Sequence, residues 1–410
     1  MGSKKKQAGR TKNGLRYYIY PQQEFGEKAA AIVVKRGANH IFWKAEGGNP
    51  LHFPEGTAHF IEHKLFQQEW GDAFTKFSQN GASANAFTDG DKTVYYFTCK
   101  EKFMENLNLL LDFVQNPYFT EEDTEKEKAV IVSEIRMYED DPDWLVYAQM
   151  MEMMYENHPV KNMIAGTAET IAEMKAETLQ KAYDTYYTTE NMVLVCTGDV
   201  SVRQVMAAAE TVQKRDSTAR VYFPLEKNYI LEKYRERQMG LSQPVFQIGF
   251  KCVPVPKENR LNCRIAMGFL LEMLAGETSD FFQEAYEKQL LDEPLGTAFF
   301  CGEGYAFAAL SGTGNCPEEV AELLIQKWKA LQKKGLEQRD FLRIRRKMLG
   351  RFLRRLDSPA SLCMGQVEWS MMDVSAAEVM ECIKALPLAE AEKLLQNAFS
   401  TDTMVLSVVR

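Results

Sequence analysis

The sequence contains an internal duplication, and this feature constrains the fold more than any other. Residues 119–142 align with residues 336–359 without a gap. In both copies a long segment with helical apolar periodicity ends at an acidic residue shortly before a proline, which cannot continue a helix. Another amphipathic segment precedes each copy, at residues 103–114 and 318–331. Two similar halves are therefore predicted, because a repeated sequence indicates a repeated architecture.

The order of the other segments is also the same in the two halves. Each half begins with a β-rich run, at residues 29–35 and 245–252, and closes with a short apolar strand, at residues 191–196 and 403–408. We expect an α+β fold in which each half is an antiparallel-rich mixed sheet packed with helices. The predicted division is a mobile basic tail at 1–15, a first α+β domain at 16–205, a linker at 206–240 and a second α+β domain at 241–410.

Composition excludes several classes of protein. No segment approaches the roughly 20 apolar residues that span a bilayer, and the N-terminus lacks the apolar core of a secretory signal. The eight cysteines are scattered without a C-x-x-C pair, so we expect them to be mostly reduced in a cytoplasmic protein. The net charge of -8 argues against nucleic acid as a partner, because phosphate binding needs a surplus of Lys and Arg. The basic segment at residues 339–355 is interpreted as a solvated or interdomain helix face.

Two of the five histidines lie in the sequence His59-Phe-Ile-Glu62-His63. Residues four apart on a helix share a face, so both imidazoles can reach one ion, and Glu62 can point to the same region. This is the H-x-x-E-H pattern of the inverzincin metallopeptidases. A helix with two surface histidines and a solvated glutamate explains these five residues equally well. The flanking apolar residues favour a metal site, because two imidazoles close to a core and without a metal would be difficult to satisfy. These residues are Phe53, Phe60, Ile61, Leu65 and Phe66.

A catalytic zinc ion usually takes three protein ligands and one water, so a third ligand is expected. Glu134 is the best candidate, because it lies beside an apolar stripe on a long predicted helix. Glu127 lies two turns earlier on nearly the same face, where it can orient a ligand. An ordinary charged helix face is the alternative. In the second copy these positions hold Arg351 and Ile344, and no histidine follows His158, so we assign the second half a structural role.

The first half resembles the pitrilysin family, which includes insulysin and the mitochondrial processing peptidases. The resemblance rests on these segments: EGTAHFIEH at residues 55–63, GASANAFT at 81–88, TVYYF at 93–97, residues 127–134, and Asp141-Pro142. It implies one Zn²⁺ per chain with His59, His63 and Glu134 as ligands, Glu62 as general base and Glu127 as a supporting carboxylate. The implied reaction is zinc-assisted hydrolysis of peptide bonds.

The resemblance also identifies a stretch that would bind substrate. In the family an edge strand at this point receives a peptide as an additional strand, through main-chain hydrogen bonds. A simple hairpin with a small-residue turn remains the alternative interpretation. The implied substrate-binding residues are Ser83, Ala84, Asn85, Ala86 and Phe87.

One departure from the family bears on partners. Complete members carry an arginine and a tyrosine, seven residues apart, in the second half, and residues 279–293 contain no such pair. The resemblance is therefore greatest to short bacterial subunits with the zinc motif, which form a heterodimer with a homologue that lacks the motif and supplies the Arg and Tyr. Such a pair encloses a chamber for peptides or short unfolded segments, with leader-peptide removal and general peptide turnover both open. A non-catalytic assembly subunit and a self-sufficient homodimeric peptidase are the alternatives.

Overall fold

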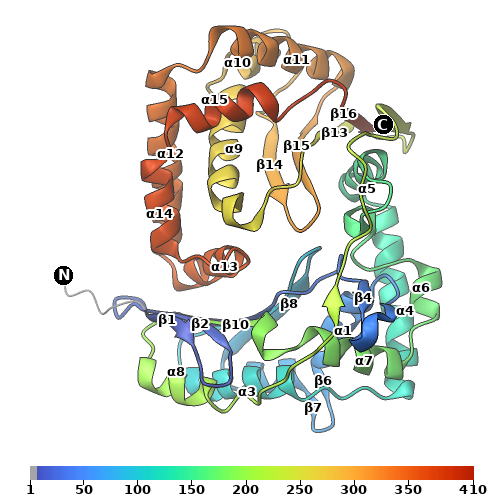
Figure 1. Cartoon of the computed structure of the whole chain (residues 1–410), viewed down its shortest axis with the longest axis vertical. Helices are drawn as coiled ribbons and strands as arrows, with labels where there is room; N and C mark the ends of the chain where they lie inside the picture. The colour runs from blue at the N-terminus through green and yellow to red at the C-terminus, as the bar shows by residue number, and fades with distance from the viewer. Residues whose placement is uncertain (1–6) are drawn as a thin grey trace. The chain divides into compact units, whose positions relative to one another are not determined.

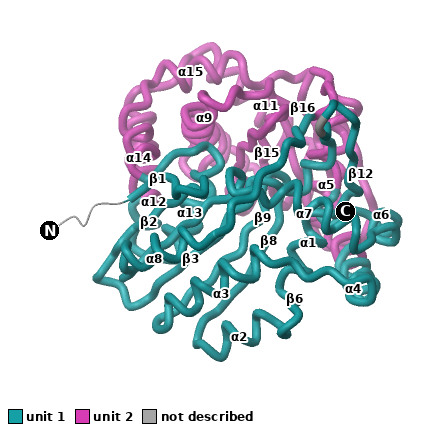
Figure 2. The backbone as a smooth tube through the Cα atoms, turned by 60° about the horizontal axis from the view of Figure 1, so that its bottom comes forward, with its two compact units in different colours: residues 1–135, 163–222, 353–376 teal, residues 136–162, 223–352, 377–410 magenta. Residues whose placement is uncertain are grey.

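The computed structural model describes residues 7–410, and the chain divides into two compact units (Figure 2). Unit 1 contains residues 1–135, 163–222 and 353–376. Unit 2 contains residues 136–162, 223–352 and 377–410. The units are therefore interleaved along the chain, whereas the division predicted from the sequence, at residues 16–205 and 241–410, is contiguous.

Unit 1 is built on a six-stranded sheet with the order β1-β2-β10-β3-β9-β8 (Figure 1). Strands β2 and β10 are parallel, and the other neighbouring strands are antiparallel. Helices α3 and α13 both pack against β3, which is why this strand is a nearly continuous apolar run rather than an alternating one. The strands are β1 (Gln7–Arg10), β2 (Arg16–Pro21), β3 (Lys28–Val34), β8 (Ala82–Thr88), β9 (Thr93–Cys99) and β10 (Met192–Gly198).

The prediction of a mobile tail at residues 1–15 is wrong for its second part. Residues Gln7–Arg10 form β1, which pairs antiparallel with β2 from Ile19 back to Arg16. Main-chain pairing at a sheet edge does not require apolar side chains, so the polar composition was a poor guide. Residues 1–6, the rest of that prediction, lie outside the described residues.

Helices α1, α2, α3 and α13 contact this sheet, and unit 1 also contains two small sheets. The helices are α1 (Thr57–Leu65), α2 (Ala73–Gln79), α3 (Phe103–Gln115), α6 (Ala168–Ala172), α7 (Ala176–Tyr186), α8 (Val202–Ala209) and α13 (Pro359–Ser370), with short 3-10 turns at Glu46–Gly48 and Thr189–Asn191. The small sheets contain β4 (Phe42–Lys44), β5 (Pro50–His52) and β11 (Arg220–Val221), and the hairpin β6 (Gln67–Gln68) with β7 (Gly71–Asp72). Helix α4 (Glu121–Glu139) begins in unit 1 and ends in unit 2.

Unit 2 is built on a five-stranded sheet with the order β12-β16-β13-β15-β14. Helix α5 packs against β13 and β16 of this sheet. The strands are β12 (Tyr234–Arg237), β13 (Val245–Lys251), β14 (Gly296–Cys301), β15 (Ala306–Thr313) and β16 (Met404–Val409). The helices are α5 (Pro142–Met154), α9 (Arg260–Ala275), α10 (Asp280–Glu287), α11 (Pro317–Lys334), α12 (Gln338–Leu356), α14 (Ala376–Ala385) and α15 (Leu388–Asn397), with 3-10 turns at Pro159–Lys161 and Lys257–Asn259.

The predicted α+β fold with two similar halves is confirmed. The duplicated segment forms α4 in the first half and α12 in the second, and the proline after each copy begins the next helix, α5 or α13. Proline suits this first helical position because its missing N–H would have no partner there. Across residues 7–410, the structure contains no helix with the length and apolar character needed to cross a membrane.

Candidate metal centre

Helix α1 carries His59, Glu62 and His63, and a close backbone approach fixes where it begins. Gly56 precedes the helix with a φ of 84°, and a Cβ at this position would lie 2.4 Å from the carbonyl oxygen of Ala165. No other residue could adopt this conformation in this space without moving the backbone. The apolar side of the helix is fully buried, so α1 presents its histidines from a rigid support.

The structure brings His59, His63 and Glu134 together. The Nε2 atom of His59 lies 3.7 Å from Glu134 Oε1, and the Nε2 atom of His63 lies 3.6 Å from Glu134 Oε2. The two imidazole rings have centroids 4.5 Å apart. All three candidate ligand atoms lie within 4.8 Å of one another, which makes this the one such cluster among the described residues.

The spacing of these atoms fits a metal ion better than direct hydrogen bonds. Both nitrogen–oxygen separations are longer than the usual range of hydrogen bonds, about 2.7 to 3.2 Å. A tetrahedral zinc ion with bonds of about 2.1 Å would separate its ligand atoms by roughly 3.4 Å. Burial, together with the neighbouring His63, lowers the pKa of His59 to about 4, so its imidazole is neutral at pH 7. A neutral imidazole offers the lone pair that a metal needs.

Glu127 lies behind the cluster and contacts His63. Its Oε1 atom lies 3.0 Å from His63 Nδ1. The hydrogen bond from His63 lowers the pKa of Glu127, so the carboxylate is ionised and Nδ1 carries the hydrogen. The second ring nitrogen of His63 is then available at the centre, and Glu127 supports a candidate ligand from outside.

Glu62 is buried, with 8% of its surface exposed, beside the histidines. Burial raises the pKa of Glu62 to about 7, and a hydrogen bond from Thr88 acts in the opposite direction. The Thr88 hydroxyl donates to Glu62 Oε2 over 2.7 Å. Sequence reasoning did not identify Thr88, although its position at the end of the GASANAFT segment was a usable signal.

The predicted substrate stretch forms the outer strand of the unit 1 sheet. Strand β8 pairs with β9 along one side, and no other strand of residues 7–410 pairs with its second side. Ser83 and Asn85 are exposed, while Ala84, Ala86 and Phe87 are half-buried. The main-chain N–H of Ala86 donates to the side-chain oxygen of Asn85 over 2.8 Å.

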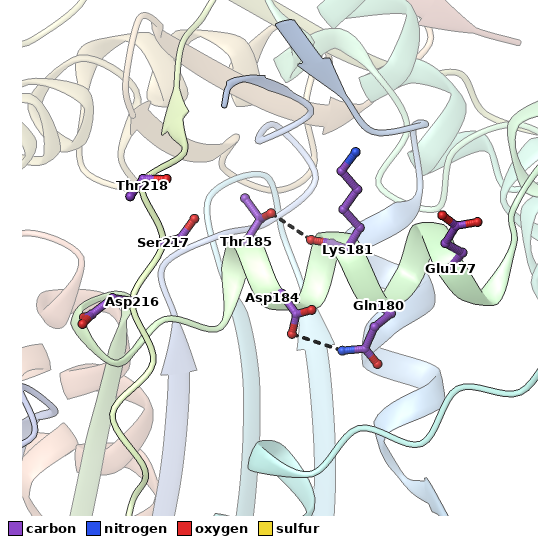
Figure 3. A pocket seen from close by; sticks show the side chains of 8 residues that line it. All are labelled: Glu177, Gln180, Lys181, Asp184, Thr185, Asp216, Ser217 and Thr218. Atoms are coloured by element: carbon purple, nitrogen blue, oxygen red, sulfur yellow. Dashed lines mark hydrogen bonds between the residues drawn. The ribbon is translucent and has the colours of Figure 1, made fainter. Parts of the chain in front are cut away.

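A separate polar pocket lies on the outward face of α7 (Figure 3). Its volume is about 600 Å³, and several of its groups bond to each other: the Gln180 amide donates to Asp184, and the Thr185 hydroxyl donates to the carbonyl of Lys181. None of the predicted site residues lines it. The lining residues are Glu177, Gln180, Lys181, Asp184, Thr185, Asp216, Ser217 and Thr218.

Comparison with known proteins agrees with this geometry. Residues 54–168 match the family model described as insulinase (peptidase family M16), and residues 173–348 match the model described as the peptidase M16 inactive domain. A protein of Bacillus subtilis strain 168 named zinc protease YmfH is 33% identical over 409 residues, which cover 97% of this chain and 94% of that protein. A Rickettsia felis protein named as a zinc protease is 27% identical, over 71% of this chain and 68% of its own length.

Solved structures agree as well. An M16-like peptidase from Alicyclobacillus acidocaldarius has a TM-score of 0.94 with 29% identity, and the similarity covers 99% of this chain and 98% of that one. A protease from Helicobacter pylori shares the fold with a TM-score of 0.82, at 17% identity, over 99% of both chains. The predicted relationship is confirmed: this chain belongs to the M16 (insulinase) family of peptidases.

Proposed function

We propose that this chain is the catalytic subunit of a zinc-dependent peptidase. The observation that carries the proposal is the meeting of His59, His63 and Glu134 around one point, with Glu62 buried beside them. Two imidazoles, one carboxylate and a free fourth position are the usual arrangement of a catalytic zinc site. Relatives that are named zinc proteases support the same reading.

The side chains divide the chemistry. His59, His63 and Glu134 would bind the zinc ion, which when bound polarises a peptide carbonyl and lowers the pKa of water. Glu62 accepts the proton of the attacking water and returns it to the leaving amine, a role that suits a carboxylate whose pKa is close to 7. Glu127 keeps the His63 ring in one orientation through its hydrogen bond to Nδ1.

The substrate would be an extended peptide that pairs with β8. Residues Ser83 to Phe87 supply main-chain groups on the side of β8 that pairs with no described strand. Pairing through the main chain tolerates varied side chains, so this mode suits an enzyme that degrades or matures different peptides. The Asn85 side chain, which bonds to the Ala86 N–H, would have to move away before a peptide could use that donor.

The second half supplies no counterpart to the arginine and tyrosine of complete members. In the corresponding segment, Tyr286 is 60% exposed on α10, and no arginine occurs between residues 279 and 293. A developing oxyanion needs such donors, so we propose a heterodimer with a zinc-lacking homologue that supplies them and closes a chamber. All eight cysteines are free thiols, which supports a reducing, cytoplasmic location for the proposed heterodimer.

The test combines metal analysis with peptide cleavage. The purified chain is mixed with a homologue that lacks H-x-x-E-H and is encoded by a neighbouring gene. Cleavage of fluorogenic unfolded peptides is then measured for the wild type, for Glu62→Gln and for the exposed control Glu125→Gln. We expect one zinc per chain in all three and loss of cleavage only in Glu62→Gln. Equal lack of cleavage in all three would indicate the assembly role. Full activity without the homologue would reject the heterodimer, and native mass measurement would then identify a homodimer.

A further inference from the structure

Lys64 follows His63 directly, and its side chain is completely buried. Its exposed fraction is 0%, although lysine is among the residues least often buried without a partner. The Lys64 ammonium donates to the side-chain oxygen of Gln67, at the start of β6. A buried lysine inside the metal-binding helix needs a physical explanation, because burying a charge is costly unless the charge is paired and hydrogen-bonded.

Gln67 connects Lys64 to the metal centre. Its Nε2 atom donates to Glu127 Oε2 over 3.2 Å, and the other oxygen of Glu127 contacts His63 Nδ1 at 3.0 Å. An unbroken series of hydrogen bonds therefore runs from Lys64 through Gln67 and Glu127 to His63.

Lys64 at one end and the Glu127 carboxylate at the other determine the direction of this series. An ammonium group only donates hydrogen bonds, so the amide of Gln67 must turn its oxygen toward Lys64 and its NH₂ group toward Glu127. With the ammonium removed, the Gln67 oxygen loses its donor, and the exposed Gln67 side chain can turn toward solvent. The Gln67 amide would then no longer donate to Glu127, and Glu127 would lose one of the contacts that hold it behind His63.

The two histidines differ in this support. His63 Nδ1 contacts Glu127, whereas His59 Nδ1 is buried and has no hydrogen-bond partner among residues 7–410. The orientation of the centre therefore depends on His63 and on the groups behind it. We propose that Lys64 and Gln67 are positioning residues that hold Glu127 on His63 and thereby set the metal affinity of the centre. This inference rests on the proposed function only in taking the centre to bind zinc.

The experiment measures zinc affinity by competition with a chromophoric chelator, on the full chain. Lys64→Met keeps the length of the side chain but cannot donate, and Gln67→Leu removes both amide contacts. We expect each variant to bind zinc about 10-fold more weakly, the size typical of losing an outer support of a metal ligand. Because the two residues act in series, the double variant should bind zinc about as tightly as either single variant.

Two controls separate positioning from a general loss of stability. Lys76→Met removes an exposed lysine that lies over the Trp70 ring and should leave the zinc affinity unchanged. The thermal midpoint of the metal-free protein should stay constant in Lys64→Met while the increase on adding zinc becomes smaller. If Lys64→Met does not fold, Gln67→Leu still tests the inference, because Gln67 is exposed and its substitution should be tolerated.

Wild-type zinc affinity in folded Lys64→Met and Gln67→Leu would overturn the inference. The readout does not require peptide cleavage. If the wild type binds zinc but cleaves nothing, the proposed function fails, and the expected affinity series would still support the positioning role.

Discussion

The aligned helices α4 and α12 carry opposite charges at one corresponding position, and each faces another helix there, α1 in the first half and α9 in the second. In the first pair, Glu134 of α4 meets two imidazoles of α1. In the second pair, the position of Glu134 is Arg351, which donates to Glu272 of α9 over 2.9 Å. Lys347 of α12 donates to the same carboxylate. Glu272 is 9% exposed, so a buried carboxylate is neutralised by two cations of its own chain.

This difference shows how one helix arrangement serves two purposes. In the second pair, the charges of α9 and α12 neutralise each other, so these two helices remain in contact without a bound ion. In the first pair, three ligand atoms converge within 4.8 Å of one another, an arrangement that suits a metal ion.

The largest expected effect comes from changing the carboxylate in the first pair. Glu134→Gln should weaken zinc binding by more than about 100-fold. Loss of an outer support typically costs about 10- to 100-fold, and loss of a direct ligand should cost more. Equilibrium dialysis with zinc measures the effect. Arg351→Gln at the corresponding position of the second pair is the matched control and should bind zinc like the wild type. Equal losses in the two variants would show that the halves do not differ in the way described.

A change of pH should destabilise unit 2 through a histidine outside the metal centre. Burial lowers the pKa of His158 to about 4, and its ring bonds to the carbonyl of Glu303 and the N–H of Val160. At a pH well above 6.5 the residue is neutral in the folded and the unfolded chain and contributes no pH dependence. Between pH 6.5 and 4 the unfolded chain takes up a proton that the folded chain does not, so the free energy of unfolding falls, by up to about 3 kcal/mol.

Urea unfolding of the wild type and His158→Gln at several pH values measures this contribution. The difference in unfolding free energy between the two proteins should change between pH 6.5 and 4 and stay constant above pH 6.5. A constant difference over the whole range would show that His158 does not titrate as described.

A smaller loss of stability should follow from breaking the ion cluster of the second pair. Glu272→Gln leaves Lys347 and Arg351 without their shared anion, which we expect to cost about 2 kcal/mol of unfolding free energy. Zinc affinity should not change. The exposed Glu277→Gln, just beyond the same helix, is the control for stability. A Glu272→Gln protein as stable as the wild type would mean that the cluster does not hold α9 and α12 together.

The smallest effect should come from the hydroxyl that contacts Glu62. Thr88→Val keeps the shape of the side chain but removes the hydrogen bond, so kcat should fall about 10-fold, as expected for losing a hydrogen bond to a charged group. KM and zinc content should stay close to the wild type. Thr88→Ser keeps a hydroxyl and should recover most of kcat. A Ser variant as slow as the Val variant would argue for a packing role instead.

The sequence was informative where spacing along one element carries the signal. The helix around His59 and His63 and the helix with Glu127 and Glu134 were both identified from periodicity, and the duplication gave the α+β arrangement of both halves. Groups that depend on contacts between distant segments were not identified. The end of the GASANAFT segment was a signal for Thr88, but its contact with Glu62 joins residues 26 positions apart and could not be derived from spacing. The burial of Lys64 depends in the same way on the segments that pack around α1.

For the same reason, the sequence did not predict which segments belong to each compact unit. Helix α5 belongs to the first half of the sequence but packs on β13 and β16, and α13 belongs to the second half but packs on β3 and β10. The sequence shows that both helices begin at equivalent prolines, but not which sheet each one covers.

This arrangement has the form of a domain swap within one polypeptide. A fragment cut between the two copies would expose a sheet face from which its covering helix had been removed, so neither fragment should be soluble alone, and co-expression of both should restore them.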